Sequence, residues 1–495
     1  MPDSQCVLVL DAGTTSTRAI LYAADGRKLA SEARDITQYY PQAGWVEHDP
    51  DQIWQATLAC ARAVISAHGG PGRVAAIGIT NQRETVVAWN KRTGRSVGRA
   101  IVWQDRRTAA HCDALRAAGH ETEVQRRTGL LLDPYFSATK MRWMLDNVPE
   151  VSALGDDLAF GTIESWLLFC LTAGDDGRGL HMSDASNASR TMLLPLAGAG
   201  WDAGLADLFG VPLSALPEVV DTMGRFGTCH NNAFGAPIPI CGLVGDQQSA
   251  TIGQGCLDPG QAKATFGTGA FILSNMGTTI PTSSNRLLGT ILWQAAGERH
   301  YALEGSIFVA GSLMQWLRDG LGLIQSAGES ADLARSVGDS GGVVIVPALA
   351  GLGAPYWRAD ATGSITGLTL GSKRAHIVRA ALESMAHQCA DLATAFAADG
   401  AGWAQMRIDG GMSANDWMAQ DLADILDIPV ERPDDVETTA LGAAMLAAVG
   451  AGLYPDLRAA CAMRPASSAF VPAMADGVRD ARLTGWHSAV DRLLR

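Results

Sequence analysis

Two glycine turns that carry hydroxyl groups are the residues of this chain best suited to phosphate chemistry. The first is Asp11-Ala12-Gly13-Thr14-Thr15-Ser16, and the second is Phe266-Gly267-Thr268-Gly269-Ala270. Each lies between two runs that read as strands, so backbone N–H groups and a hydroxyl can approach a phosphate with no side chain in the way. Two such turns in one protein predict that they bind the linked phosphate groups of one ligand from opposite sides.

A lone carboxylate stands between the two turns. Asp246 follows the apolar run of residues 238–243 and belongs to Gly245-Asp246-Gln247-Gln248. A carboxylate at the end of a buried strand is suited to act as a general base. The competing interpretation is that it caps a following helix.

An arginine and a glutamate stand side by side in Asn81-Gln82-Arg83-Glu84-Thr85, where the expected strand of residues 74–80 ends. A donor beside an acceptor matches a ligand with several hydroxyls. Neighbouring strand residues point to opposite faces, so both can reach one ligand only if the strand ends here in a bulge or turn. The alternative for this dipeptide is an ordinary surface ion pair.

Two pairs of residues at helical spacing follow the second turn. Gly311 and Gln315 are four residues apart on an expected helix of residues 308–321, and Gly411 and Asn415 repeat that spacing. The second pair follows a strand at residues 406–409, and Ser413 is the expected helix cap. Backbone can approach a flat ring at these glycines, but close helix packing is the competing explanation.

The composition narrows the class of protein. With 495 residues the chain is too long for one core, which indicates two domains or three. A net charge of −13 argues against nucleic acid or an anionic membrane as the main partner. Nine scattered cysteines without a Cys-x-x-Cys pair favour reduced core thiols, and neither a signal peptide nor a membrane span is evident. These features predict a soluble cytoplasmic protein.

The expected elements occur in the same order in both halves. Strands at residues 6–10, 17–22 and 28–33 precede a helix that Asp49 caps and a strand at residues 74–80. The second half repeats this with strands at residues 262–266 and 271–274, a hairpin over 292–303 with Gly297 near its tip, and then a helix. The repetition predicts two related α/β domains that face a shared cleft, with residues 253–260 as the linker.

Many of these motifs, taken in order, resemble those of the glycerol-phosphorylating members of the sugar and polyol kinase (FGGY) family. The resemblance extends from Leu8 to about Leu453. The matching segments are Asp11-Ala-Gly-Thr-Thr-Ser-Thr-Arg18, Gly44-Trp-Val-Glu-His-Asp-Pro50, Gly78-Ile-Thr-Asn-Gln-Arg-Glu-Thr85, Ile101-Val-Trp-Gln104, Asp133-Pro-Tyr-Phe136, Asn187-Ala-Ser-Arg-Thr191, Gly245-Asp-Gln-Gln248, Phe266-Gly-Thr-Gly269, Ala302-Leu-Glu-Gly305, Gly351-Leu-Gly-Ala-Pro-Tyr-Trp357 and Asp409-Gly-Gly411.

The resemblance implies an α/β fold of two actin/RNase H-like domains with mixed sheets around a central cleft. Residues 1–253 would form the N-terminal domain, with the glycerol side and the first phosphate turn. Residues 254–495 would form the C-terminal domain, with the second phosphate turn and the adenosine side. The implied reaction is in-line transfer of the γ-phosphoryl group of ATP to glycerol, which gives sn-glycerol 3-phosphate and opens glycerol catabolism.

The resemblance also implies a role for individual residues, and Asp246 becomes the base. The implied glycerol contacts are Arg83, Glu84, Tyr135, Asp246 and Gln247, with Trp103 and Phe271 as an apolar wall. The implied phosphate contacts are Thr14, Thr15, Ser16, Arg18 and Thr268, and the adenosine side is Gly311, Gln315, Gly411 and Asn415. Mg²⁺ would lie near Asp11. A homo-oligomer, dimer or tetramer, is the implied assembly, with no nucleic acid and no membrane insertion.

Two departures from the family pattern concern the first turn and regulation. Ala12 replaces the usual glutamine, so the turn can bind phosphate only through its backbone N–H groups and its hydroxyls. The loop that binds fructose 1,6-bisphosphate in some bacterial members is replaced by His230-Asn-Asn-Ala-Phe-Gly-Ala-Pro237, which argues against that regulation. Two other functions remain: a kinase for another small polyol or dihydroxyacetone, and an actin-like or chaperone-like ATPase.

Overall fold

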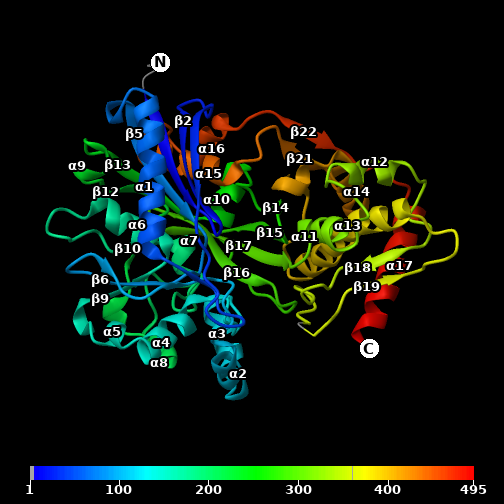
Figure 1. The fold of residues 1–495 in the computed structure, drawn as a ribbon, viewed down its shortest axis with the longest axis horizontal. Coiled ribbons are helices and arrows are strands. Elements are labelled where there is room, and N and C mark those ends of the chain that lie inside the picture. The colour runs from blue at the N-terminus through cyan, green and yellow to red at the C-terminus, as the bar shows by residue number, and fades with distance from the viewer. Residues whose placement is uncertain (1–4, 359) are drawn as a thin grey trace.

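Two large mixed β-sheets form the centre of the molecule (Figure 1). The computed structural model describes residues 5–358 and 360–495. The first sheet has the strand order β12 (Met223–Thr228), β13 (Pro239–Gly245), β5 (Val74–Asn81), β1 (Cys6–Ala12), β2 (Ser16–Ala23), β3 (Lys28–Asp35). The second has the order β16 (Leu288–Ala295), β17 (Glu298–Ile307), β15 (Ala270–Gly277), β14 (Gln261–Phe266), β20 (Gln405–Asp409), β21 (Val430–Pro433), β22 (Ser467–Phe470).

The two sheets share one strand plan. In the first, β2 runs antiparallel to both β1 and β3, and β5 and β13 add parallel strands on the other side of β1. In the second, β14, β15 and β17 form the antiparallel part, and β20 and β21 add the parallel strands. The repeated order of elements is therefore confirmed, and the two glycine turns occupy equivalent hairpins, β1–β2 and β14–β15.

Local sequence explains the first of these elements. Every residue of β1 is buried, as expected for an apolar run in the middle of a sheet that is covered on both faces. Helix α1 (Pro50–Ala67) begins after Asp49, whose side chain accepts hydrogen bonds from the N–H groups of Asp51 and Gln52. This is the expected cap, with proline in the first turn.

Two helices lie side by side between the sheets. α10 (Asp246–Gly253) follows β13 directly, and α15 (Thr438–Gly450) comes from the second half of the chain. α15 packs on β13, β5 and β1 of the first sheet, while α10 also touches β14 and β15 of the second. A Cβ on Gly442 would lie 1.9 Å from the Ser249 carbonyl oxygen, so the two helices are in backbone contact.

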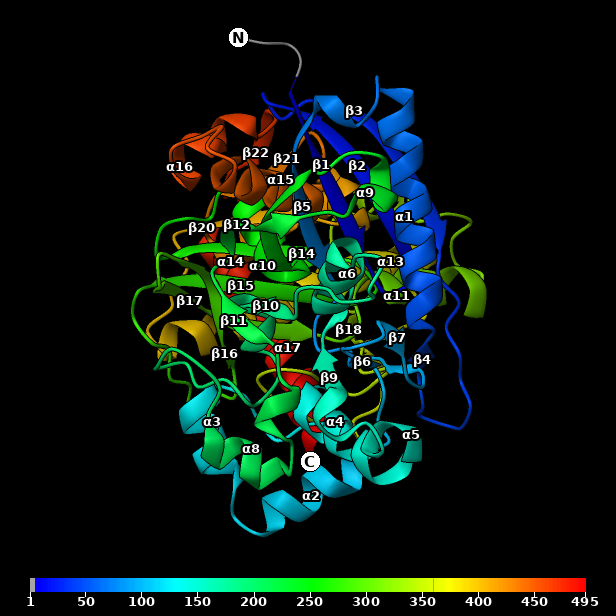
Figure 2. The same ribbon diagram turned by 90° about the vertical axis from the view of Figure 1, so that its left-hand side faces the viewer.

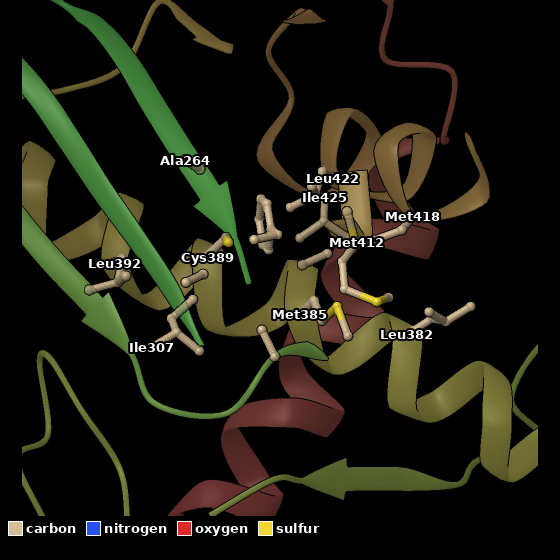
Figure 3. Close-up of a cluster of buried hydrophobic side chains, with 14 of the residues drawn as sticks. Ala264, Ile307, Leu382, Met385, Cys389, Leu392, Met412, Met418, Leu422 and Ile425 are labelled. Atoms are coloured by element: carbon tan, nitrogen blue, oxygen red, sulfur yellow. The ribbon is translucent and has the colours of Figure 1, made fainter. Parts of the chain in front are cut away.

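The opposite faces of the sheets are covered by other helices. α1 and α6 (Ile163–Thr172) pack on the first sheet. On the second, α13 (Arg374–Ala398) and α14 (Asp416–Leu426) enclose a core that includes Met385, Cys389, Met418 and Leu422 (Figure 3). Each large sheet is thus covered on both faces.

A lobe of short elements inserted after β5 forms the foot of the molecule in both views (Figures 1 and 2). Its helices are α2 (Ala109–Ala117), α3 (Glu121–Thr128), α4 (Ser137–Asn147), α5 (Pro149–Ser152) and α8 (Ala203–Phe209). The small sheets beside it are β4 (Glu47–His48) with β8 (Ala100–Ile101), and β7 (Arg95–Ser96) with β6 (Val87–Asn90) and β9 (Leu158–Gly161). α7 (Ala185–Ala188) follows β10 (Met182–Asp184), which pairs with β11 (Glu218–Val220).

The remaining elements lie outside the two large sheets. They are α9 (Asn231–Phe234), α11 (Gly311–Gln315), α12 (Glu329–Arg335), α16 (Leu457–Ala460), α17 (Asp476–Leu494), and β18 (Val344–Val346) paired with β19 (Ser364–Thr366). All nine cysteines are free thiols, and seven of them are buried. Within residues 5–358 and 360–495, no helix combines the length and the apolar character needed to cross a membrane.

The helix expected over residues 308–321 starts later than predicted. α11 begins at Gly311, and a π-helical turn, Trp316–Gly320, continues it. Residues 308–310 instead bring the chain back to the second glycine turn, where the N–H of Ala310 binds the Thr268 carbonyl. The helix start is thus set by contact with that turn, which periodicity does not encode.

Candidate active site

Arg83 and Glu84 lie in a turn at the end of β5, and both are buried. Their exposed fractions are 3% and 1%, so the surface ion pair considered for this dipeptide is wrong. Glu84 has a φ of 59°, which turns the chain and lets both side chains face the same site. The sequence predicts such a turn if Arg83 and Glu84 are to reach one ligand, and the turn is present.

Glu84 is held in this left-handed conformation by contacts to its carbonyl oxygen. Ser137 Oγ donates to that oxygen at 3.0 Å and Lys140 Nζ at 3.4 Å. Lys140 also donates to the carbonyls of Tyr135 and Phe136, and burial lowers the pKa of this lysine to about 8. Positive φ at a non-glycine residue is costly and persists where surrounding contacts enforce it, commonly at functional sites.

Two further charged residues complete this cluster. Glu304 of β17 accepts from both terminal nitrogens of Arg83, at 2.6 and 3.2 Å. Arg190 donates to Glu304 at 3.0 Å and to Glu84 at 2.7 Å. Burial acts to raise the pKa of Glu304, but the charges of Arg190 and Arg83 hold it at about 2.

Asp246 begins α10 beside Arg83. Its Oδ1 lies 3.3 Å from Arg83 Nε, and 29% of its side chain remains exposed. Burial raises the pKa of Asp246, and the neighbouring Arg83 charge opposes that rise. A carboxylate with a raised pKa that still reaches an opening is suited to accept a proton.

Gln247 is oriented from the second sheet. Lys263 Nζ of β14 donates to its Oε1 at 2.7 Å and to Thr265 Oγ1 at 3.0 Å. Because its carbonyl oxygen is bound to Lys263, the amide nitrogen of Gln247 is the end left to face a ligand. Lys263 thus links Gln247 to β14, the strand that leads into the second glycine turn.

Three aromatic rings form one wall of this cluster. Trp103 contacts Tyr135 and Phe271 edge-on, with ring centroids 5.6 and 6.3 Å apart. All three side chains are half-buried, so they are not ordinary core aromatics. Trp103 Nε1 also donates to Thr14 Oγ1 at 3.0 Å, which joins the wall to the first glycine turn.

The first turn is closed by backbone. The N–H of Gly13 binds the Ser16 carbonyl at 3.0 Å, and Gln82 Nε2 donates to the Gly13 carbonyl. Thr14 and Ser16 are half-buried and Thr15 is exposed. Arg18 points from β2 toward the second half of the chain, where it pairs with Glu437 at 2.6 Å.

Asp11, the residue predicted to lie near Mg²⁺, is buried at the end of β1. Burial raises the pKa of its carboxyl to about 7, with Asp246 adding to the rise. Within residues 5–358 and 360–495, no group donates a hydrogen bond to this carboxylate, and no cluster of three His, Cys, Asp or Glu could bind a metal. A buried acidic oxygen without a donor fits a hard cation, which would take its other ligands from water and phosphate.

The second turn is joined to α11. The carbonyls of Gly267 and Thr268 accept from the N–H groups of Gly311 and Ser312, at 2.9 and 3.0 Å. A Cβ on Gly311 would lie 2.5 Å from the Gly267 carbonyl oxygen and 3.2 Å from Met412. Close packing therefore explains this glycine, and the same contact brings the turn next to residues 410–412.

The predicted adenosine residues are only partly brought together. Gly411 is exposed and faces open space, and Gln315 is exposed on α11. The expected cap Ser413 is wrong, because Asn415 caps α14 by accepting from the N–H of Met418. Gly411–Ala414 is a separate 3₁₀ turn, so Gly411 and Asn415 do not share a helix face. The Asn415 amide also donates to Ser330.

Comparison with known proteins agrees with this arrangement. Residues 6–253 match the N-terminal domain, and residues 262–451 the C-terminal domain, of the FGGY family of carbohydrate kinases. The chain belongs to the FGGY family. The "Glycerol kinase" of Rhodospirillum centenum is 52% identical over 495 residues, covering 99% of both chains. That of Methylobacterium nodulans is 52% identical over 99% of this chain and 98% of its own.

Solved structures of the FGGY fold superpose on the whole chain. The Plasmodium falciparum glycerol kinase with ADP gives a TM-score of 0.94 at 34% identity, with 99% of both chains covered. A xylulose kinase from Rhodospirillum rubrum gives 0.87 at 26% identity, also over 99% of both chains. The two-domain actin/RNase H-like architecture predicted for this chain is thus confirmed.

Several residues at the centre of the site were not predicted from the sequence. Glu304, Arg190, Lys263 and Lys140 lie in motifs that supported the family resemblance or next to them, but none was given a role. A signal was present for Glu304 and Lys263: Lys263 is the single charge of β14, and Glu304 is the single charge in the buried part of β17, residues 301–307. Such a charge requires a buried partner.

Proposed function

We propose that this FGGY family member is a glycerol kinase that transfers the γ-phosphoryl group of ATP to glycerol and yields sn-glycerol 3-phosphate. One observation carries the proposal: the hydroxyl-binding cluster and the phosphate turn are in direct contact, through the Trp103–Thr14 hydrogen bond. The acceptor would therefore lie where a phosphate held by the turn could reach it. Relatives named glycerol kinase, about half identical over the full length, support this substrate.

The acceptor would bind among Arg83, Glu84, Tyr135 and Gln247, with its carbon chain against Trp103 and Phe271. Arg83 and the Gln247 amide nitrogen would donate to hydroxyl oxygens, while Glu84 would accept from a hydroxyl. Asp246 would take the proton of the attacking hydroxyl. Most of the acceleration in a loose phosphoryl-transfer transition state comes from this positioning and from neutralising the phosphate oxygens.

The donor side would use the two glycine turns. Thr14, Thr15, Ser16 and Thr268 would bind phosphate oxygens through backbone N–H groups and hydroxyls, with Arg18 as a cation. The carboxylate of Asp11 would hold Mg²⁺, which supplies charge neutralisation for the transferring phosphoryl group when bound. Adenosine would lie beside the Gly311 and Gly411 backbones, near Gln315 and Asn415.

We also propose that the chain divides after Gly253 into two domains, that it forms a homo-oligomer, and that it acts in the cytoplasm. The two family matches end and begin at residues 253 and 262, which supports the division. Light scattering of the purified protein would give the assembly.

A polyol panel tests the proposed acceptor. Purified protein with ATP and Mg²⁺ should phosphorylate glycerol with a higher kcat/KM than erythritol, xylulose or dihydroxyacetone, because the relatives that match over the full length are named glycerol kinase. ATP hydrolysis is followed in parallel. An ATP hydrolysis rate that no polyol changes would instead indicate an ATPase. A higher kcat/KM for another polyol would identify that polyol as the acceptor.

Asp246→Asn tests the base. Proton acceptance contributes on the order of 10²- to 10⁴-fold, so kcat should fall by at least about 100-fold. Binding of ADP, measured by calorimetry, should stay within about threefold because Asp246 faces the acceptor. Asp416→Asn is the matched control, since Asp416 is also the first residue of its helix and pairs with Arg432. A near-normal rate in Asp246→Asn would exclude Asp246 as the base.

A further inference from the structure

Four buried charges form a closed ring at the acceptor site. Arg83 contacts Glu304 at 2.6 Å, Glu304 contacts Arg190 at 3.0 Å, Arg190 contacts Glu84 at 2.7 Å, and Glu84 lies 3.9 Å from Arg83. No side chain of the four is more than 2% exposed. Positive and negative groups alternate around the ring, and its net charge is zero.

The ring joins three separate parts of the chain. Arg83 and Glu84 follow β5 of the first sheet, and Arg190 follows α7. Glu304 comes from β17, an interior strand of the second sheet, where its register partners are Leu273 and Leu288. A carboxylate among leucines is stable only with close cationic partners. The ring therefore fixes the acceptor residues of the first sheet against the second.

The contacts of Arg83 show what Glu304 does there. Its carboxylate takes both terminal nitrogens of the guanidinium, a bidentate pairing that fixes the plane of the group. Arg83 Nε remains directed at Asp246, and Nη2 lies 3.4 Å from the Tyr135 hydroxyl. With Glu304 bound, Arg83 can donate to a hydroxyl but offers little uncompensated charge to an anion.

We propose that Glu304 and Arg190 are positioning residues of the acceptor site, and that their neutral ring restricts it to uncharged polyols. This inference rests on the proposed function. Glu304 fixes Arg83, Arg190 fixes Glu84, and neither contacts the acceptor. An acceptor that carries a carboxylate would meet an already paired Arg83 next to the negative Asp246, so the site would reject it.

Glu304→Gln separates this role from general support of the fold. The variant keeps the size of the side chain but gives the ring a net positive charge. The KM for glycerol should rise at least tenfold, because Arg83 is no longer held by a carboxylate, while the KM for ATP stays within threefold. Glycerate, measured as a competitor of glycerol, should bind at least fivefold more tightly than to the unsubstituted enzyme.

Opposite shifts for the two ligands are the deciding result, since a loosened fold would weaken both. Glu298→Gln, on the same strand but exposed, is the matched control and should change neither constant. If Glu304→Gln gives no folded protein, Arg190→Gln makes the complementary change to a negative ring. It should raise the KM for glycerol at least tenfold without tightening glycerate.

The inference is overturned if glycerate and glycerol weaken together in Glu304→Gln, or if the KM for ATP rises as much as that for glycerol. It is also overturned if the unsubstituted enzyme binds glycerate as tightly as glycerol. Failure of the proposed function is distinguishable from these results, because the unsubstituted enzyme would then prefer another polyol to glycerol or phosphorylate none.

Discussion

Arg18 illustrates how one residue of the proposed phosphate site is engaged by the opposite half of the chain. Its guanidinium lies 2.6 Å from Glu437, the residue directly before α15, and both side chains are about one third exposed. A phosphate that binds Arg18 must compete with this carboxylate. The pair therefore opposes nucleotide binding by roughly the strength of a partly exposed ion pair, about 0.2–1 kcal/mol.

Glu437→Gln should accordingly lower the KM for ATP by about 1.4- to 5-fold and leave the KM for glycerol unchanged. Asp435→Asn is the matched control, because the Lys28–Asp435 pair joins the neighbouring strand β3 to the same segment before α15, with similar exposure, but involves no predicted phosphate residue. Steady-state kinetics with varied ATP give the answer. An unchanged or higher KM for ATP in Glu437→Gln would show that the pair does not restrain Arg18.

At the scale of residues, the sequence predicted the members of the proposed acceptor cluster better than the residues that hold them in place. Arg83, Glu84, Tyr135 and Asp246 lie together as expected. Glu304 and Arg190 were missed because their roles depend on which segments meet, and the meeting of β17 with the turn after β5 is a long-range contact. The helix face expected to be shared by Gly411 and Asn415 was wrong for the opposite reason, since Asn415 caps α14 locally and Gly411 lies in a separate 3₁₀ turn.

At the scale of elements, the contact between α10 and α15 positions Asp246. Added Cβ atoms on Gly253 and Gly442 would lie 2.1 and 1.9 Å from backbone oxygens of the opposite helix. Neither glycine has a positive φ, so close approach of the two helices is what requires them. Because Asp246 is the first residue of α10, any separation of the helices moves the proposed base.

Gly442→Ala should therefore impair both stability and catalysis. Insertion of a methyl group against backbone forces the helices apart, at a cost of about 1–3 kcal/mol in the free energy of unfolding, and kcat should fall with it. Gly477→Ala is the control: this glycine is exposed in the first turn of α17 with nothing near its added Cβ, and the change should be neutral or slightly stabilising. Urea unfolding and initial rates measure the two effects. Wild-type values for Gly442→Ala would mean that the contact is not tight.

Among the elements that the sequence predicted, the antiparallel units of the two sheets and the capped α1 were found, because they depend on local patterns. The start of α11 was not, since it depends on hydrogen bonds to the second glycine turn. Predicted elements whose ends depend on residues close in sequence were therefore found where expected. The helix whose start depends on a distant segment, α11, begins later than predicted.

At the scale of the whole molecule, the two halves of the chain share part of their core. One buried cluster combines Val7, Val9 and Val244 of the first sheet with Ala443 and Leu446 of α15. One face of the first sheet, which is built from the N-terminal half of the chain, is therefore covered by α15 from the C-terminal half. Chain length indicates two domains or three, but it carries no information about which half covers which sheet.

This exchange predicts that residues 1–253 do not fold stably alone. Without α15, the apolar face formed by β13, β5 and β1 would be exposed to water, and each buried valine would lose about 1.5–3 kcal/mol. The isolated fragment should bind a hydrophobic dye and unfold without a cooperative urea transition. Co-expression with residues 254–495, or fusion of residues 438–463 through a flexible linker, should restore cooperative unfolding, because either supplies the missing helix. Cooperative unfolding of residues 1–253 alone, at the midpoint of the whole chain, would show that α15 contributes nothing to this core.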